Sequence, residues 1–136
     1  MLYCGVYLLA SFGLFHAVYE QGLAATYAGA YLFSRCLSAL CAVTMPNARR
    51  SGMLCAFTEH VHKKTALTAI AVLLILTGAL LLWQAPVGFV LALLWCLWYR
   101  RLAMEQFGGA TGDTAGFFLQ IAELVMLLGV WIGGLL

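Results

Sequence analysis

Charged side chains are scarce in this sequence. Only 9% of the 136 residues are charged, with seven lysines and arginines and five aspartates and glutamates, whereas 65% are hydrophobic. A soluble domain has about 25% charged residues. So few charges cannot cover a water-exposed surface. The composition therefore excludes a soluble domain and predicts a multi-pass membrane protein.

The sequence also has no CxxC pair, although it contains five cysteines. The cysteines are scattered, and four of them lie in hydrophobic stretches. We therefore expect buried, reduced thiols rather than a zinc site or a disulfide framework. The net charge of +2 is small, and no nucleic-acid partner is expected.

Long hydrophobic runs alternate with short polar breaks. Because a helix of about 20 residues crosses the hydrocarbon core of a membrane, the runs predict an all-α fold, a polytopic transmembrane helix bundle with about five spans in one domain, residues 1–136. Trp95, Trp98 and Tyr99 fit an interfacial aromatic belt. The spans are expected at residues 2–19, 23–45, 65–83, 87–99 and 115–136, with polar loops at 46–64 and 100–113.

Six of the basic residues lie in these two polar loops, which five spans place on the same face of the membrane. The opposite face contains no lysine or arginine. Since cytoplasmic loops have an excess of lysine and arginine, we expect the basic face and the N-terminus in the cytoplasm of a bacterial cell, with the spans in its inner membrane. The six residues are Arg49, Arg50, Lys63, Lys64, Arg100 and Arg101.

The segment GGATGDTAG, residues 108–116, is a glycine-rich polar loop that contains Asp113, the only aspartate of the chain. Glycines let main-chain N–H groups approach a ligand closely, and Thr111 or Asp113 can cap the helix that follows. Mg²⁺ sites commonly use one or two carboxylates plus phosphate oxygens. We interpret Asp113 as a Mg²⁺ ligand beside a substrate phosphate. A plain capped loop is the alternative, and further acids are expected from elsewhere.

Two ionisable residues lie deep in predicted spans. Glu123 is ten residues beyond Asp113 and Arg35 is ten residues before Met45, which places both about 15 Å from the cytoplasmic ends of their helices. Intramembrane charges are rare and tend to pair. We therefore predict an ion pair between Arg35 and Glu123. A purely structural pair and a direct role in the site remain equal alternatives.

Rows of small residues predict close helix packing, because small side chains let membrane helices approach one another. Gly129 and Gly133 form a GxxxG pair in the last span. A second row recurs every four residues in the second span. Its members are Ala30, Ser34, Ser38 and Ala42.

The pattern GG-x-TGD-x-x-G, followed by a glutamate ten residues after the aspartate, resembles the cobalamin synthase family, the adenosylcobinamide-GDP ribazoletransferases. The upstream stretch SRCLSALCAVTMPNARRSGM is also similar to the family at Arg35, Pro46, Arg49 and Gly52. The similarity extends over essentially the whole chain. The residues that match the glycine pattern are Gly108, Gly109, Thr111, Gly112, Asp113, Gly116 and Glu123.

This resemblance implies a reaction and a set of roles. α-Ribazole or its 5′-phosphate attacks adenosylcobinamide-GDP at phosphorus, GMP leaves, and adenosylcobalamin or its phosphate forms with Mg²⁺ required. Asp113, Glu123 and Arg35 are the expected catalytic residues, with Asp113 on the metal. The expected substrate-binding residues are Gly108, Gly109, Thr111, Gly112, Gly116 and Arg49.

The chain departs from the family pattern in two ways. Ala115 and Phe117 stand where the family often has leucine and alanine, and Gln120 often has an acidic counterpart; the bulky Phe117 is expected to narrow the groove. Family members are also usually nearly twice as long. Their first half contains a DGxxDxxDG motif, to which the resemblance assigns the main metal site and which is absent here.

The chain therefore resembles the C-terminal half of a family member. A fragment, a truncated product and one part of a split protein are open alternatives, and the missing half or a second copy of the chain is an expected partner. Two other functions also remain open. A CDP-alcohol phosphatidyltransferase-like enzyme shares the reaction type but needs several aspartates. A transporter or channel subunit explains Arg35 and Glu123 but not the glycine loop.

Overall fold

The computed structural model describes residues 2–47 and 62–135. This part of the chain forms five α-helices, and its only bridge of β type is an isolated one between Asn47 and Ala110. The all-α prediction is therefore confirmed. The helices are α1 (Leu2–Glu20), α2 (Ala24–Thr44), α4 (Lys63–Gln84), α5 (Pro86–Phe107) and α6 (Gly112–Leu135).

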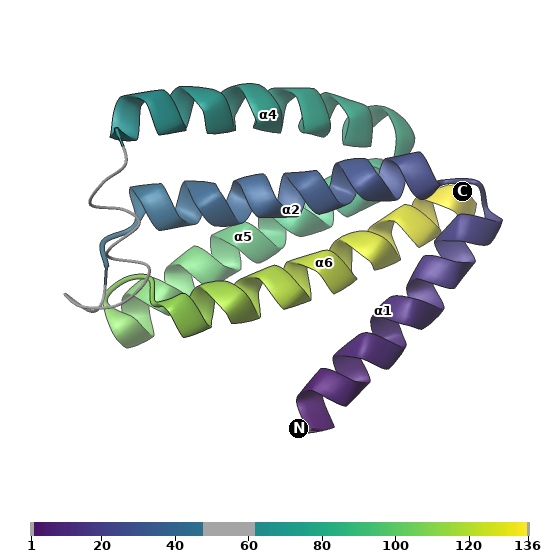
Figure 1. Ribbon diagram of the computed structural model, residues 1–136, viewed down its shortest axis with the longest axis horizontal. Coiled ribbons are helices and arrows are strands. Elements are labelled where there is room, and N and C mark those ends of the chain that lie inside the picture. Colours follow the sequence, from purple (N-terminus) through teal and green to yellow (C-terminus); the bar gives the residue numbers. More distant parts are fainter. Residues whose placement is uncertain (1, 48–61, 136) are drawn as a thin grey trace.

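Four of the helices, α2, α4, α5 and α6, lie side by side with their axes along the length of the molecule (Figure 1). Helix α6 packs against α1, α2 and α5, and α2 also packs against α4. Helix α1 runs obliquely beneath this bundle, so that its N-terminus stands away from the other helices (Figure 1). The last helix is thus the central element, and residues along α6 face three different neighbours.

Small residues make the tightest helix contacts, as the sequence predicts. Gly129 of α6 lies directly against Gly88 of α5, so closely that a Cβ on Gly129 would lie 2.7 Å from the Gly88 nitrogen. Gly133 is less crowded, since a Cβ there would lie 3.4 Å from the Ala85 Cα, an ordinary contact distance. Ala30 and Ser34 of the α2 row are fully buried. In lipid there is no hydrophobic effect to hold helices together. Close approach stabilises the bundle instead through dispersion contacts between the helices.

The outer surface of the bundle suits a lipid environment. Helices α4, α5 and α6 are each long and apolar enough to cross a membrane. Large apolar side chains point outward from them, including Ile75, Leu94 and Leu97. In water such a surface would be a large exposed apolar patch of the kind that marks a membrane contact. The protein is therefore a helical membrane bundle, and among the described helices three meet this criterion of length and composition.

Helix α5 corrects one prediction. The span expected at residues 87–99 continues to Phe107, so the predicted loop at 100–113 is helical over its first half. Tyr99 consequently does not lie in an interfacial belt: it is 2% exposed, and its hydroxyl donates to the Thr114 hydroxyl oxygen on α6 at 3.3 Å. Arg100 and Arg101 suggested a loop because they are charged, yet long basic side chains can extend to the membrane surface from inside a helix.

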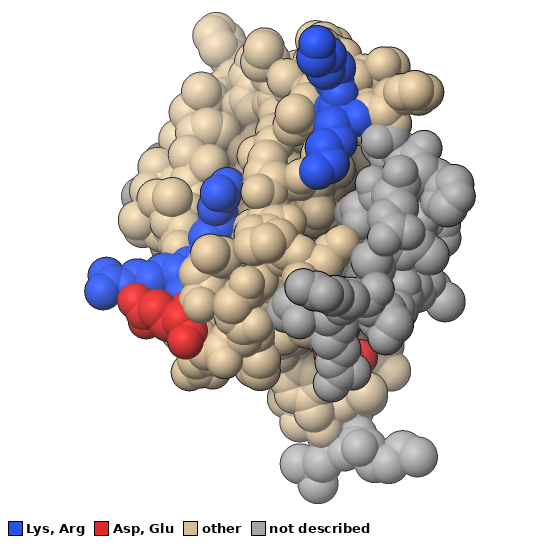
Figure 2. All heavy atoms as spheres, turned by 90° about the vertical axis from the view of Figure 1, so that its left-hand side faces the viewer, with Lys and Arg blue, Asp and Glu red and all other residues tan. Residues whose placement is uncertain are grey.

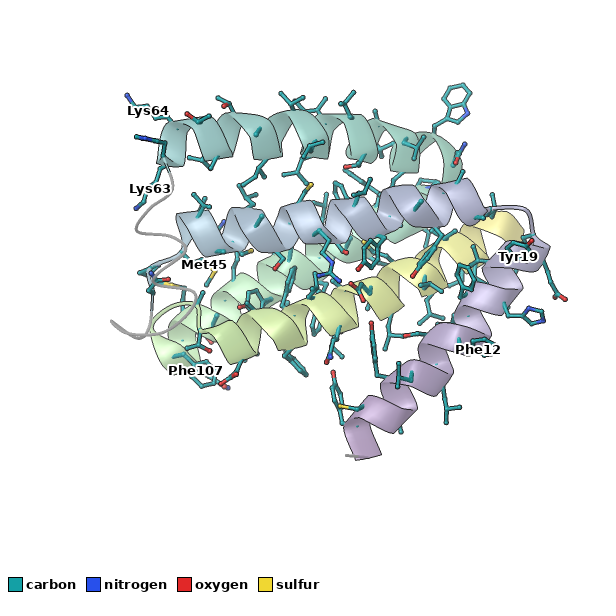
Figure 3. All side chains as sticks on the ribbon, in the orientation of Figure 1. Phe12, Tyr19, Met45, Lys63, Lys64 and Phe107 are labelled. Atoms are coloured by element: carbon teal, nitrogen blue, oxygen red, sulfur yellow. The ribbon has the colours of Figure 1, made fainter. Side chains whose placement is uncertain are left out.

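The lysines and arginines of the described chain, except Arg35 in the middle of α2, gather at one end of the bundle. Lys63 and Lys64 begin α4, and Arg100 and Arg101 belong to the last two turns of α5. Figure 3 places Lys63, Lys64, Met45 and Phe107 at this end and Tyr19 at the other. Figure 2 shows the end face with its lysine and arginine side chains. We call this the basic end.

Candidate functional site

The glycine loop begins where α5 stops at the basic end. Gly108 has φ 67°, a left-handed conformation that favours glycine and ends the helix. The N–H groups of Gly108 and Gly109 donate back to the carbonyl oxygens of Met104 and Ala103, each at 3.2 Å. These bonds satisfy carbonyl groups that the end of α5 would otherwise leave without donors.

The next two residues fasten the loop to the end of α2 and to the start of α6. The Ala110 N–H donates to the Pro46 carbonyl at 2.9 Å. Thr111 caps α6: its hydroxyl accepts from the Thr114 N–H at 3.2 Å, and its own N–H donates to the Thr114 hydroxyl at 3.0 Å. This reciprocal pair is a capping box with threonine in place of glutamate. The capping role expected of Thr111 or Asp113 therefore falls to Thr111.

These bonds decide which loop amides remain free. The N–H groups of residues 108–111 all donate to acceptors within the protein. Within the described chain, the N–H groups of Gly112 and Asp113, in the first turn of α6, have no such acceptor. Only these two amides of the segment can therefore donate to a bound anion without breaking an existing hydrogen bond, and they lie at the positive end of the α6 dipole.

Asp113 is exposed in the first turn of α6. No hydrogen bond or ion pair with another described residue involves its carboxylate. A Cβ added at Gly112 or at Gly116 would have no neighbour within 4 Å. Among the described residues, the surface around Asp113 is thus open and no partner occupies its carboxylate.

A cavity of about 320 Å³ lies beside Asp113, between the last turns of α5 and the first turns of α6. Its wall is mostly aromatic and aliphatic, with Asp113, Thr114 and Gln106 as its polar members. Asp113 therefore lies next to a hollow that can hold part of a substrate. The lining residues are Tyr99, Leu102, Ala103, Gln106, Phe107, Asp113, Thr114 and Phe117.

Arg35 and Glu123 do form an ion pair, as predicted, with Arg35 Nη2 3.0 Å from Glu123 Oε1. Tyr7 of α1 donates its hydroxyl to Glu123 Oε2 at 2.5 Å, and Tyr31 accepts from Arg35 Nη2 at 2.5 Å. The Arg35 guanidinium also lies over the Tyr31 ring, 4.7 Å from its centre. The Glu123 side chain is only 10% exposed while that of Arg35 is 47% exposed. The pair therefore links α1, α2 and α6.

The structure thus separates the two acids that the sequence groups together. Asp113 is free and exposed at the basic end, whereas both carboxylate oxygens of Glu123 have partners ten residues further along α6. The described residues include no cluster of three or more His, Cys, Asp or Glu side chains that could hold a metal ion. Asp113 is consequently a single ligand candidate. Arg49, Arg50 and Gly52 fall outside the described residues.

Comparison with known proteins identifies the family. The family model described as "Cobalamin-5-phosphate synthase" matches residues 1–131. The chain belongs to this family. A cobalamin-5-phosphate synthase relative from Lachnoclostridium phytofermentans, named adenosylcobinamide-GDP ribazoletransferase, is 35% identical over 130 residues, which cover 93% of this chain and 49% of the relative. A relative of the same name from Pseudomonas putida strain GB-1 is 32% identical, over 93% of this chain and 51% of the relative.

The chain therefore spans about half the length of the curated cobalamin-5-phosphate synthase relatives that it matches. No solved structure matches it. The family predicted from the glycine pattern is confirmed, and the similarity to only half of each relative agrees with the family-length argument from the sequence.

The structure brings residues to this region that the sequence does not single out. Tyr31 is four residues before Arg35, so their contact could have been found from helical spacing. The contact of Tyr7 could not have been found from the sequence, because 116 positions separate Tyr7 from Glu123. The tilt of α1 against α6 brings the two residues together. Phe107 and Gln106 lie in the stretch for which the sequence predicts a loop, so the sequence does not indicate their place in the cavity wall. Phe117, which is expected to narrow a groove, does line this cavity.

Proposed function

We propose that this chain provides the C-terminal half of a membrane transferase that joins adenosylcobinamide-GDP to α-ribazole or its 5′-phosphate and releases GMP. The curated relatives that match this chain are named adenosylcobinamide-GDP ribazoletransferase. The proposal rests on the surroundings of Asp113 in the first turn of α6. Its carboxylate and two neighbouring amides have no partner among the described residues, and a cavity lies beside them. The family assignment favours this reaction over the phosphatidyltransferase and transporter alternatives.

Asp113 is the residue of this chain that would hold Mg²⁺. A free, exposed carboxylate suits a hard cation that binds through one or two carboxylates and substrate phosphates. When bound, the ion would neutralise charge on the diphosphate. Asp113 is the one carboxylate at this site among the described residues, so the other protein ligands would come from other segments of the complete protein.

The residues around Asp113 would bind and orient the diphosphate. The free N–H groups of Gly112 and Asp113 would donate to phosphate oxygens at the start of α6. Gly108, Gly109 and Thr111 would shape the loop and hold it against Pro46, and Gly116 would leave room beside the substrate. Arg49 would add a positive charge, and the basic end as a whole attracts anionic substrates. We place this end in the cytoplasm.

Arg35 and Glu123 would act as positioning residues rather than catalytic ones. Their mutual bond and the bond from Tyr7 fix α6 against α1 and α2. A fixed α6 would hold Asp113 in the same position in every turnover. This matters because small misplacements of reacting groups lower the rate by large factors.

The test uses this chain together with the N-terminal half of the Lachnoclostridium phytofermentans relative, expressed in one membrane. GMP release from adenosylcobinamide-GDP in the presence of α-ribazole and Mg²⁺ is measured. We expect Asp113→Asn to lower the rate at least about 100-fold, since lost stabilisation of developing charge has that size. The matched control is Glu105→Gln, which removes an exposed acid at the same end and should leave the rate within about 2-fold.

Unchanged product formation by Asp113→Asn would contradict the proposal. So would an inactive pair of halves when the intact relative is active under the same conditions. Glu123→Gln separates the two roles of the acids: we expect it to reduce protein stability together with rate, whereas Asp113→Asn should reduce the rate alone.

A further inference from the structure

The cavity beside Asp113 is too small for one of the two proposed substrates. Its volume is about 320 Å³, near the lower limit of the 300–1,000 Å³ range of ligand pockets. A corrinoid with its macrocycle, side chains and nucleotide is far larger. A nucleoside consisting of a two-ring base and a ribose is of the right size. Size therefore favours the acceptor.

The walls of the cavity suit a flat apolar ring. Phe107 from the end of α5 and Phe117 from α6 both line it, and they are 51% and 42% exposed. The Phe117 ring also lies 6.4 Å from the rings of Tyr3 and Trp95, but it keeps exposed surface, as Phe107 does. Tyr99, in contrast, is buried against Phe118. Exposed aromatic rings provide stacking surfaces for heterocyclic bases.

The polar side of the cavity suits a ribose. The Thr114 hydroxyl is already bonded to Thr111 and Tyr99. Gln106 and Asp113 make no hydrogen bond with another described residue, so a side-chain amide and a carboxylate remain to receive hydroxyl groups. Because Asp113 marks the proposed position of the diphosphate, a nucleoside bound here would place its ribose, with a free ring hydroxyl that is present in both α-ribazole and its 5′-phosphate, toward the phosphorus to be attacked.

We propose that this cavity is the acceptor subsite, in which the base of α-ribazole lies against the rings of Phe107 and Phe117 with its ribose toward Asp113. The inference rests on the proposed function and adds the place of the second substrate.

Equilibrium binding of radiolabelled α-ribazole to the purified chain in lipid nanodiscs tests the subsite without requiring turnover. We expect Phe107→Ala and Phe117→Ala each to weaken binding about 10-fold, from the loss of one stacking surface. Leu102→Trp should abolish binding because its larger side chain fills the cavity. The matched controls are Phe12→Ala on α1 and Leu97→Trp on α5, both of which change exposed residues outside the cavity.

Competition on the unaltered chain provides an independent measurement. Nucleosides with flat two-ring bases should displace α-ribazole, and ribose 5-phosphate should not. Binding that Leu102→Trp leaves unchanged would overturn the subsite, as would displacement by ribose 5-phosphate alone or no α-ribazole binding at millimolar concentration.

The paired halves described above distinguish this failure from a failure of the proposed function. Under the proposal, Leu102→Trp raises the KM for α-ribazole at least about 10-fold and changes the KM for adenosylcobinamide-GDP less than 2-fold. If the pair is active and Leu102→Trp does not change its KM for α-ribazole, the subsite is refuted but the proposed reaction is not. An active pair in which both KM values rise equally also refutes it. A pair that forms no product refutes the reaction itself.

Discussion

At the scale of single residues, the decisive contrast is between the two acids of α6. Asp113 and Glu123 belong to the same helix, yet their surroundings give them different capacities. Glu123 already has a cation and a hydroxyl as partners, so a substrate would have to displace them. Asp113 has no partner among the described residues and can accept a ligand without any such loss. Availability, rather than residue type, makes Asp113 the candidate.

The Arg35–Glu123 pair leads to a charge-reversal prediction. Arg35→Glu or Glu123→Arg alone brings like charges together inside the bundle, and each should lower the free energy of unfolding by about 1–3 kcal/mol. This is less than for a fully buried pair, because Arg35 is 47% exposed. The double variant should recover most of the loss, since it restores an opposite pair. Unfolding in mixed detergent micelles measures all three.

Arg101 and Glu105 provide the control for this cycle, because they form an ion pair at 2.8 Å between largely exposed side chains. Reversing that pair should change stability very little, as is typical of surface pairs. A double variant of Arg35 and Glu123 that remains as unstable as its worse single variant would contradict the pairing.

At the scale of helices, glycine contacts between α5 and α6 determine where the loop between them lies. The two helices touch backbone to backbone at Gly88 and Gly129, near the end opposite the loop. At the loop end they are joined through Tyr99 and Thr114. The cavity beside Asp113 lies between the last turns of α5 and the first turns of α6, so the angle between these helices sets its width.

Gly129→Ala tests this packing. A Cβ at this position would overlap Gly88, so α5 and α6 must separate, and we expect a loss of about 2 kcal/mol in the free energy of unfolding. Gly13→Ala is the matched control, because a Cβ there meets no atom within 4 Å. It should be neutral or slightly stabilising, since alanine favours a helix. Equal effects of the two substitutions would rule out close packing at Gly129.

At the scale of the whole molecule, charge is distributed between the two ends of the bundle. The described lysines and arginines other than Arg35 lie at the basic end with the glycine loop (Figure 2). Glu20 and His16 lie near the opposite end, 3.5 Å apart. From this asymmetry we predict an orientation with the basic end in the cytoplasm, because basic segments tend to stay on that side of a membrane.

Cysteine labelling in intact cells checks that orientation. In a cysteine-free background, Glu20→Cys should react with a membrane-impermeant maleimide added outside. Lys63→Cys should react only after the membrane is permeabilised, since it begins α4 at the basic end. The reverse pattern of labelling would place Asp113 on the external side and remove it from cytoplasmic substrates.

Much of this fold could be predicted from one sequence because membrane helices follow a simple rule. A run of apolar residues long enough to cross the hydrocarbon must bond its own backbone, and a helix does so locally. The close contacts of Gly129 could be predicted for a different reason, because small residues four positions apart let membrane helices approach one another. The end of α5 could not, because Arg100, Arg101 and Glu105 are polar enough to suggest a loop while their helix continues to Phe107.

The sequence by itself determined the membrane class, the helical fold, the family and the candidates Asp113, Arg35 and Glu123, since composition, run length and motif spacing are local properties of the chain. Only the tertiary structure decided that Glu123 is held by Arg35 and Tyr7, that the loop is fastened to Pro46, and that Phe107 and Phe117 form a cavity with Asp113. These features depend on how helices distant in sequence cross and tilt, and that geometry comes from the packing of side chains across the whole bundle.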